Sequence, residues 1–199
     1  MLYKKILKRM FDVLFAISIL LIFLPVIVFI SAIIYFESQG SIFYINNRAG
    51  KDGKSFKMIK FRTMIQDFKD KGIDEHEAIT KFGLFLRKTS LDEIPEFLNI
   101  LIGDMSVVGP RPLLTKYVSR YNEKHFMRLS VKPGITGLAQ VSGRNSLSWE
   151  DKFDIDVEYV DNISLLGDLK IIFLTIKVIL YRDNIDSSGK HMEEFKGYK

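Results

Sequence analysis

The longest apolar run in the sequence extends from Val13 to Phe36 and contains 24 residues without a charged side chain. At about 1.5 Å per residue, a helix of this length is long enough to cross a lipid bilayer. The run is too long for an ordinary signal peptide and no small-residue cleavage site follows it, so we expect it to stay in the mature protein. The pattern predicts a membrane anchor over residues 1–38 and a second domain over residues 39–199.

Basic residues lie on both sides of this run, four before it and six between residues 48 and 62, and basic flanks favour the cytoplasmic side of a membrane. Pro25, near the middle, removes one backbone hydrogen bond and can bend the helix. Each half would be about 18 Å long, too short for a hydrocarbon core of about 30 Å. We therefore expect a re-entrant helix-break-helix at Pro25 that enters and leaves on the cytoplasmic side. A single span kinked at proline is the alternative.

Beyond the anchor, the pattern predicts an α+β domain with mostly helix. Residues 41–50 and 54–64 alternate apolar and polar positions around glycines 50 and 53, which is typical of a short β-hairpin. Residues 67–88 are highly charged and indicate a helix or loop that ends in FGLFLRK. Helices are expected over residues 91–102 and 113–128, and over 145–162 with a start near Ser148.

Another helix is expected over residues 165–183. Its polar positions recur at spacings of seven, Lys170 with Lys177 and Asp168 with Thr175, while apolar residues cover the rest. This pattern is typical of an amphipathic helix lying in the membrane interface. Periodicity alone also fits a helix that is buried against the soluble core.

Composition and charge limit which binding partners and which metal ions are expected. The net charge of +5 is concentrated in residues 1–66, which hold ten Lys and Arg against three Asp and Glu, so membrane lipids are the expected anionic partner. No nucleic-acid partner is expected, because no zinc-finger, helix-turn-helix or aromatic RNA-binding signature is present. Cysteine is absent and the three histidines lie far apart, which argues against thiolate chemistry and a zinc site and leaves Mg²⁺ on carboxylates as the expected metal.

Asp92 and Glu93 form an acidic pair in SLDEIPE, residues 90–96. Ser90 with Glu93 three residues later matches a helix-capping pattern, which would place both carboxylates in the first turn of a helix. Backbone N–H groups there favour an ionised carboxylate. Pro95 indicates that the helix start is irregular or begins later. On local sequence alone, the plain interpretation is two charges that decorate a helix start.

Several cations add a second interpretation. Arg111 lies between Pro110 and Pro112, which stiffen the backbone around it, and Arg144 lies in a glycine-rich segment that allows close approach to a ligand. Arginine suits two-pronged recognition of phosphate. Lys60 in KFRTM and Arg87 just before the acidic pair are candidates to complete an anion site. Each cation alone is typical of solvated surface, whereas several on rigid loops indicate a site for phosphate groups.

Four segments together resemble the bacterial sugar transferase family, the monotopic phosphoglycosyl transferases. They are KRMFD at 8–12, KFRTM at 60–64, SLDEIPEFLNILIGDMSVVGPRPLL at 90–114 and KPGITGLAQVSGRN at 132–145. The resemblance covers essentially the whole chain. At this length the chain is similar to the minimal members that transfer diacetylbacillosamine phosphate in protein N-glycosylation. Leu24-Pro25 stands where small members carry Ser-Pro, which leaves the geometry of the bend open.

The resemblance implies a ping-pong reaction at the cytoplasmic face of the bacterial inner membrane. Asp92 would attack a UDP-sugar, release UMP and form a covalent phosphosugar, which polyprenyl (undecaprenyl) phosphate then takes as polyprenyl diphosphate sugar. It implies Glu93 as catalytic partner, Arg111 and Arg144 as phosphate ligands, and Mg²⁺ associated with Asp92. Hexose 1-phosphate transfer for capsule or exopolysaccharide and a non-catalytic membrane scaffold are the alternatives. A homo-oligomer is possible, since no motif addresses assembly.

Overall fold

The computed structural model describes residues 3–38, 40–68, 70, 72–74, 77–143, 146–181 and 194–198. In this part of the chain the fold is mostly helical with two small two-stranded sheets, which confirms the predicted α+β class. The helices are α1 (Lys8–Ile22), α2 (Leu24–Ser38), α3 (Lys81–Thr89), α4 (Glu96–Ile102), α5 (Glu123–Phe126), α6 (Leu138–Ser142), α7 (Trp149–Asp161) and α8 (Leu165–Tyr181). The strands are β1 (Phe43–Ala49), β2 (Ser55–Phe61), β3 (Ser106–Val108) and β4 (Gly134–Thr136).

The apolar N-terminal run forms two helices, with a bend of 62° between α1 and α2. Among the described residues, no single helix has both the length and the apolar character to cross a membrane, whereas this bent pair together has them. The break is centred on Phe23, whose N–H donates to the Ile19 carbonyl while its own carbonyl accepts from Ile27. We expected the break at Pro25, but Pro25 is the second residue of α2. Proline is tolerated there because the N–H groups in the first turn of a helix have no acceptor within the helix, so the missing N–H costs no hydrogen bond.

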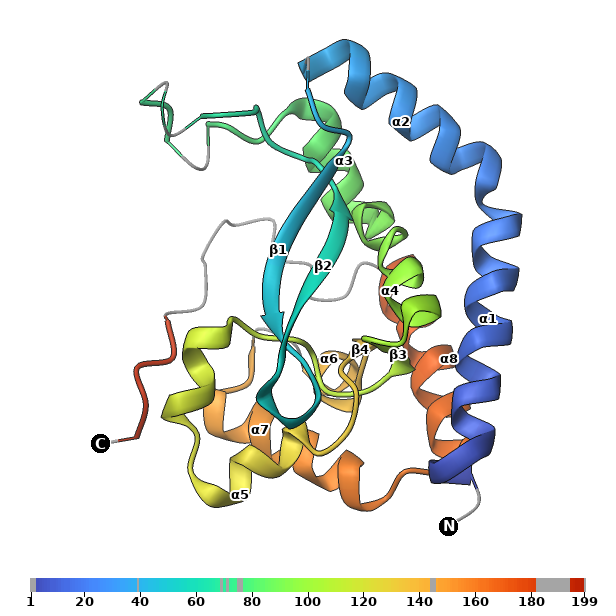
Figure 1. Cartoon of the computed structure of the whole chain (residues 1–199), viewed down its shortest axis with the longest axis vertical. Coiled ribbons are helices and arrows are strands. Elements are labelled where there is room, and N and C mark those ends of the chain that lie inside the picture. The colour runs from blue at the N-terminus through green and yellow to red at the C-terminus, as the bar shows by residue number, and fades with distance from the viewer. Residues whose placement is uncertain are drawn as a thin grey trace.

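The bent pair runs along one side of the protein and over its end (Figure 1), and it is fastened to the rest of the fold by side chains of α1. Arg9 donates to the carbonyls of Ile100 (2.6 Å) and Leu101 (3.1 Å) at the end of α4. Asp12 is buried and accepts from the Ser106 hydroxyl (2.8 Å) and the Val107 N–H (3.0 Å). The charged residues of KRMFD thus hold α1 on the core.

The predicted hairpin is confirmed, with β1 and β2 antiparallel in a register that pairs Ala49 with Ser55 and Tyr44 with Lys60. The turn includes Asp52 at φ 56° and Gly53 at φ 73°. Residues paired across an antiparallel ladder point to the same face. One face of this hairpin therefore carries Tyr44, Asn46, Arg48, Phe56, Met58 and Lys60.

The two helices predicted over residues 91–102 and 113–128 are shorter than expected. The first is a 3₁₀ turn, Leu91–Glu93, followed by α4, since Pro95 delays the α-helix to Glu96. The second prediction was wrong in its continuity: 3₁₀ segments at Thr115–Arg120 and Met127–Leu129 flank α5. Asn122 starts α5 anew because its side chain accepts from the His125 N–H. α7 agrees with expectation, and Ser148 caps it in a capping box with Asp151.

The helix α8 exposes apolar residues and buries polar ones, so the predicted polar stripe is wrong in part. Asp168, 0% exposed, accepts from Tyr3 (2.6 Å), Lys8 (2.7 Å) and Tyr159 (2.9 Å). Thr175 bonds to Thr136 of β4 (2.7 Å). Lys170 and Lys177 are exposed, together with the apolar side chains Leu166, Phe173 and Leu180. Residues 182 and 183 of the predicted helix lie outside the described residues.

Candidate active site

Asp92 and Glu93 lie in the 3₁₀ turn that joins α3 to α4. Ser90, in the left-handed conformation at φ 55°, ends α3 and makes no side-chain cap, so the predicted capping box is wrong. The Glu93 side chain instead points across to the hairpin and the loop after β3, where its carboxylate accepts from Lys60 (2.6 Å) and Arg111 (3.2 Å). Long-range ion pairs have overridden the local capping signal.

The Glu93 carboxylate is thus held by two cations. Burial opposes its ionisation, but Lys60 and Arg111 outweigh burial and lower the pKa of Glu93 to about 2. Lys60 also lies 3.1 Å from Glu96, which is buried at the start of α4. Burial and the Glu93 charge raise the pKa of Glu96 to about 7. Lys60, which we predicted as a phosphate ligand, is therefore occupied in holding two carboxylates.

Asp92 is different, because its carboxylate has no hydrogen-bond or ion-pair partner in the part of the chain that the structure describes. Burial and the neighbouring Glu93 charge raise the pKa of Asp92 to about 6, although nearby cations act in the opposite direction. Two adjacent carboxylates with pKa values pushed apart are typical of a site in which they have different roles. Glu93 is fixed in place, and Asp92 is available to a ligand.

Two of the arginines that we predicted around this pair lie on different elements, Arg87 on α3 and Arg111 on the loop after β3. Arg87, exposed at the end of α3, donates through Nε to the Thr63 hydroxyl (2.8 Å). Arg111 donates to Glu93, its side chain is 48% exposed, and its backbone carbonyl accepts from buried Arg128 (2.8 Å). Both guanidinium groups are near enough to Asp92 to lower its pKa. Arg144 lies outside the described residues, so its role as a phosphate ligand stays a prediction.

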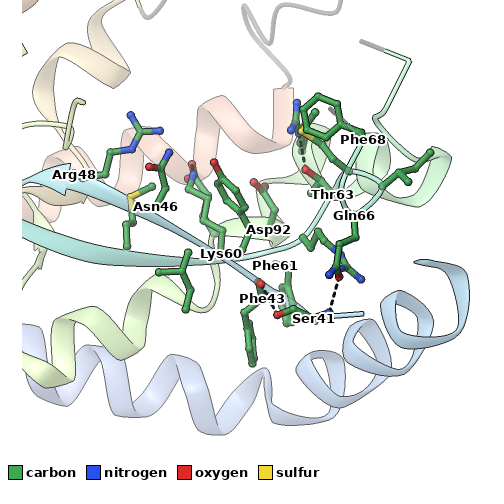
Figure 2. A pocket seen from close by; sticks show the side chains of 18 of the residues that line it. Ser41, Phe43, Asn46, Arg48, Lys60, Phe61, Thr63, Gln66, Phe68 and Asp92 are labelled. Atoms are coloured by element: carbon green, nitrogen blue, oxygen red, sulfur yellow. Dashed lines mark hydrogen bonds and ion pairs between the residues drawn. The ribbon is translucent and has the colours of Figure 1, made fainter. Parts of the chain in front are cut away.

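These side chains line one cavity of about 710 Å³ between the hairpin, the segment after β2 and the acidic turn. Figure 2 shows Asp92 on the same side of the hairpin as Asn46 and Arg48, which rise from β1. The structure brings five predicted site residues to this cavity: Lys60, Arg87, Asp92, Glu93 and Arg111. A volume of this size is in the range of small-molecule sites.

Sequence reasoning missed three residues of the site. Arg48 was counted only among the basic residues that flank the membrane segment, although strand alternation places it on the same face as Lys60. Thr63 and Glu96 lie in the motifs KFRTM and SLDEIPE, but no local pattern assigns either of them a role in the site. Their places become evident only in the folded chain, where Arg87 of α3 bonds to Thr63 and Lys60 of β2 lies beside Glu96 of α4.

The described residues contain no group of three or more His, Asp or Glu side chains placed to hold a metal ion. Mg²⁺ is often bound by one or two carboxylates together with substrate phosphates and water. The unpartnered carboxylate of Asp92 fits that mode, whereas Glu93 is already held by two cations. The site therefore fits Mg²⁺ as an ion that shares the phosphate groups of a bound ligand.

A free, partly buried carboxylate among cations in a cavity is typical of an enzyme site for a phosphorylated ligand. The family model for bacterial sugar transferases matches residues 3–182. An uncharacterized sugar transferase, EpsL of Bacillus subtilis, is 45% identical over 92% of each chain. This chain therefore belongs to the bacterial sugar transferase family and is a transferase.

Two longer relatives have names that state a reaction. The undecaprenyl-phosphate galactose phosphotransferase of Salmonella typhimurium is 38% identical over 90% of this chain and 41% of its own length. The UDP-glucose:undecaprenyl-phosphate glucose-1-phosphate transferase of Escherichia coli is 39% identical over 86% of this chain and 40% of its own length. In both cases the present chain spans less than half of the relative.

Proposed function

We propose that this protein transfers a hexose 1-phosphate from a UDP-sugar to undecaprenyl phosphate, giving undecaprenyl diphosphate sugar and UMP. The observation that carries the proposal is the contrast inside the acidic pair, in which Glu93 is held by Lys60 and Arg111 while Asp92 faces the cavity without a partner. The names of related proteins support the substrates, since they state a UDP-sugar and undecaprenyl phosphate.

The proposed chemistry proceeds in two displacements at one phosphorus atom. An Asp92 carboxylate oxygen attacks the β-phosphorus of the UDP-sugar, the bond to the bridging oxygen breaks, and UMP leaves with that electron pair. A phosphate oxygen of undecaprenyl phosphate then attacks the aspartyl phosphosugar, and the bond to Asp92 breaks to restore the carboxylate. Two dissimilar substrates can thereby use one cavity in turn.

The surrounding charges have to offset the attack of an anion on an anionic diphosphate. Arg87 and Arg111 lie at the cavity with partly free guanidinium groups and are suited to hold phosphate oxygens. Mg²⁺, when bound at Asp92 and the diphosphate, would neutralise further negative charge there. Since the pKa of Asp92 is about 6, its carboxylate is mostly ionised at neutral pH and ready to attack.

The names of the relatives bear on which sugar the protein transfers. Their names give galactose or glucose together with a lipid carrier or undecaprenyl phosphate, which favours the hexose alternative over diacetylbacillosamine. A panel of UDP-galactose, UDP-glucose and UDP-diacetylbacillosamine, incubated with undecaprenyl phosphate and assayed for UMP release, tests the proposal. We expect release with a UDP-hexose. Absence of UMP from every sugar would favour a non-catalytic scaffold.

We further propose that α1 and α2 form a re-entrant anchor in the inner membrane and leave the cavity at its cytoplasmic face. Leu14, Leu21, Phe29 and Phe36 are exposed on this pair, and α8 exposes Phe173, so apolar surface is available for lipid. Basic residues on both flanks favour one side of the membrane for both ends. Labelling of an N-terminal tag from outside intact cells would contradict the re-entrant arrangement.

Replacing Glu93 by glutamine is expected to lower kcat by about 10²- to 10³-fold, because a misplaced reacting group costs that much when positioning is lost. The neutral amide cannot keep the ion pairs to Lys60 and Arg111, so both cations shift relative to Asp92. Steady-state UMP release and thermal unfolding check this expectation. Asp161→Gln, a charge removal at an exposed residue of α7, serves as control, and an unchanged kcat in Glu93→Gln would contradict the assigned role.

A further inference from the structure

Arg48 projects from β1 on the face of the hairpin that borders the cavity. It follows Asn46 by two positions on that face, and Lys60 lies on the same face of the paired strand. Figure 2 shows the guanidinium of Arg48 directed away from the strands, beside the Asn46 amide and on the side where Asp92 lies. The backbone of Arg48 is fixed by pairing with Phe56 and by a bridge to Leu114, so the side chain has a rigid base.

The guanidinium of Arg48 is poorly satisfied. Its Nε is buried without a hydrogen-bond partner, and within the described ranges no carboxylate lies at ion-pair distance from it. Lys60, which lines the same cavity, is by contrast paired with Glu93. Burying the Nε of a half-buried guanidinium without an acceptor is costly, and an anion bound there would offset that cost.

Arg48 also stands among charges of its own sign. It lines the main cavity and a smaller adjoining one of about 50 Å³, and it shares both with Lys60 and Arg111. Burial lowers the pKa of Arg48, and the positive charge of Arg111 lowers it further. The group remains protonated at neutral pH, as arginine does in proteins. An anion between Arg48 and Arg111 would relieve both the desolvation and the repulsion.

We propose that Arg48 is a substrate-binding residue that holds a phosphate group in the cavity together with Arg111. The inference rests on the proposed function and deepens it, since it adds a phosphate ligand on the hairpin opposite the acidic turn. Two groups have the required chemistry, the diphosphate of the nucleotide sugar and the phosphate of the lipid acceptor. Two-pronged donation from a guanidinium suits either of them.

The test compares Arg48→Gln with wild type as full-length proteins in lipid nanodiscs. KM is measured separately for the UDP-hexose that wild type uses and for undecaprenyl phosphate, and UDP binding is titrated directly. We expect KM for one of the two substrates to rise about 10- to 100-fold with a smaller change in kcat, the size expected for a lost charge-assisted hydrogen bond. Lys57→Gln, an exposed cation of β2 on the opposite face of the hairpin, should retain wild-type KM values.

The outcomes distinguish the donor diphosphate from the acceptor phosphate. They also distinguish failure of the Arg48 proposal from failure of the proposed function. A raised KM for the UDP-hexose with weaker UDP binding assigns Arg48 to the donor, and a raised KM for undecaprenyl phosphate alone assigns it to the acceptor. Unchanged KM values and UDP binding overturn the role of Arg48 while leaving the transferase proposal intact. Absence of turnover in wild type overturns the proposed function. The comparison of UDP binding between wild type and Arg48→Gln then still tests whether Arg48 holds a phosphate group.

A measurement on wild type covers the case in which Arg48→Gln does not fold. Phenylglyoxal modifies accessible guanidinium groups, and mass spectrometry of the digested protein reports each arginine separately. We expect UDP or undecaprenyl phosphate to slow modification of Arg48 and to leave Arg120, which lies outside the cavity, unaffected. Equal modification of Arg48 with and without either compound overturns the proposal.

Discussion

Replacing Asp92 by asparagine is expected to reduce UMP release by at least about 10⁴-fold, because the amide lacks the anionic oxygen that attacks phosphorus. Asn has nearly the same shape, and no hydrogen bond or ion pair holds Asp92 within the described structure, so the fold should be kept. Incubating wild type with a UDP-hexose and no lipid acceptor should add the mass of a phosphosugar to the protein. The same incubation should leave the mass of the Asp92→Asn variant unchanged.

Two controls make this experiment decisive. Asp92→Ala excludes activity that arises from deamidation of the asparagine, and Asp161→Asn removes an exposed carboxylate that does not line the cavity. We expect the first to be inactive and the second to be fully active. Full turnover in Asp92→Ala would contradict the assignment of Asp92 as nucleophile. Turnover lost without any covalent adduct in wild type would retain an essential Asp92 but contradict the covalent intermediate.

The elements that could be predicted are those fixed by local pattern. The hairpin follows from alternation around a glycine turn, α7 from the cap at Ser148, and the bent helix pair from a long apolar run with a break expected near its middle, although the break lies at Phe23 and not at Pro25. The region 113–128 could not be predicted as broken, because its apolar spacing resembles a helix while Asn122 starts a new one. Asp168 could not be predicted as buried, because its three donors come from the distant α1 region and α7.

The sequence predicted which residues meet at the site better than it predicted which of them bind to one another. Motif residues on the acidic turn, the hairpin and the loop after β3 do meet in one cavity. The S-x-x-E spacing nevertheless gave the wrong geometry for Glu93, because Lys60 lies 33 residues away in sequence and attracts its carboxylate more strongly than a backbone N–H does. Sequence shows that Lys60 is charged but not that it bonds to Glu93 and lies 3.1 Å from Glu96, and its role as a phosphate ligand stays a prediction.

Arg128→Met is expected to lower the free energy of unfolding by about 3–5 kcal/mol and the melting temperature by about 6–20 °C. Arg128 is 2% exposed and donates to Asp156 through Nε (3.0 Å) and Nη2 (2.7 Å). Removing it leaves the buried Asp156 carboxylate without its ion-pair partner. The Nη2 group of Arg128 also donates to the Arg111 carbonyl (2.8 Å), so the loop that presents Arg111 to Glu93 loses its support.

A second substitution separates these two consequences. Asp156→Leu, added to Arg128→Met, removes the uncompensated charge and should recover most of the lost stability, since a buried ion pair is often replaceable by apolar side chains. It cannot restore the donor to the Arg111 carbonyl, so kcat/KM should stay about 10- to 100-fold below wild type in the double variant. Thermal unfolding and UMP release measured on the same samples give both quantities. If stability and activity recover together, Arg128 serves only to neutralise Asp156, and the position of Arg111 is set by Pro110 and Pro112 instead.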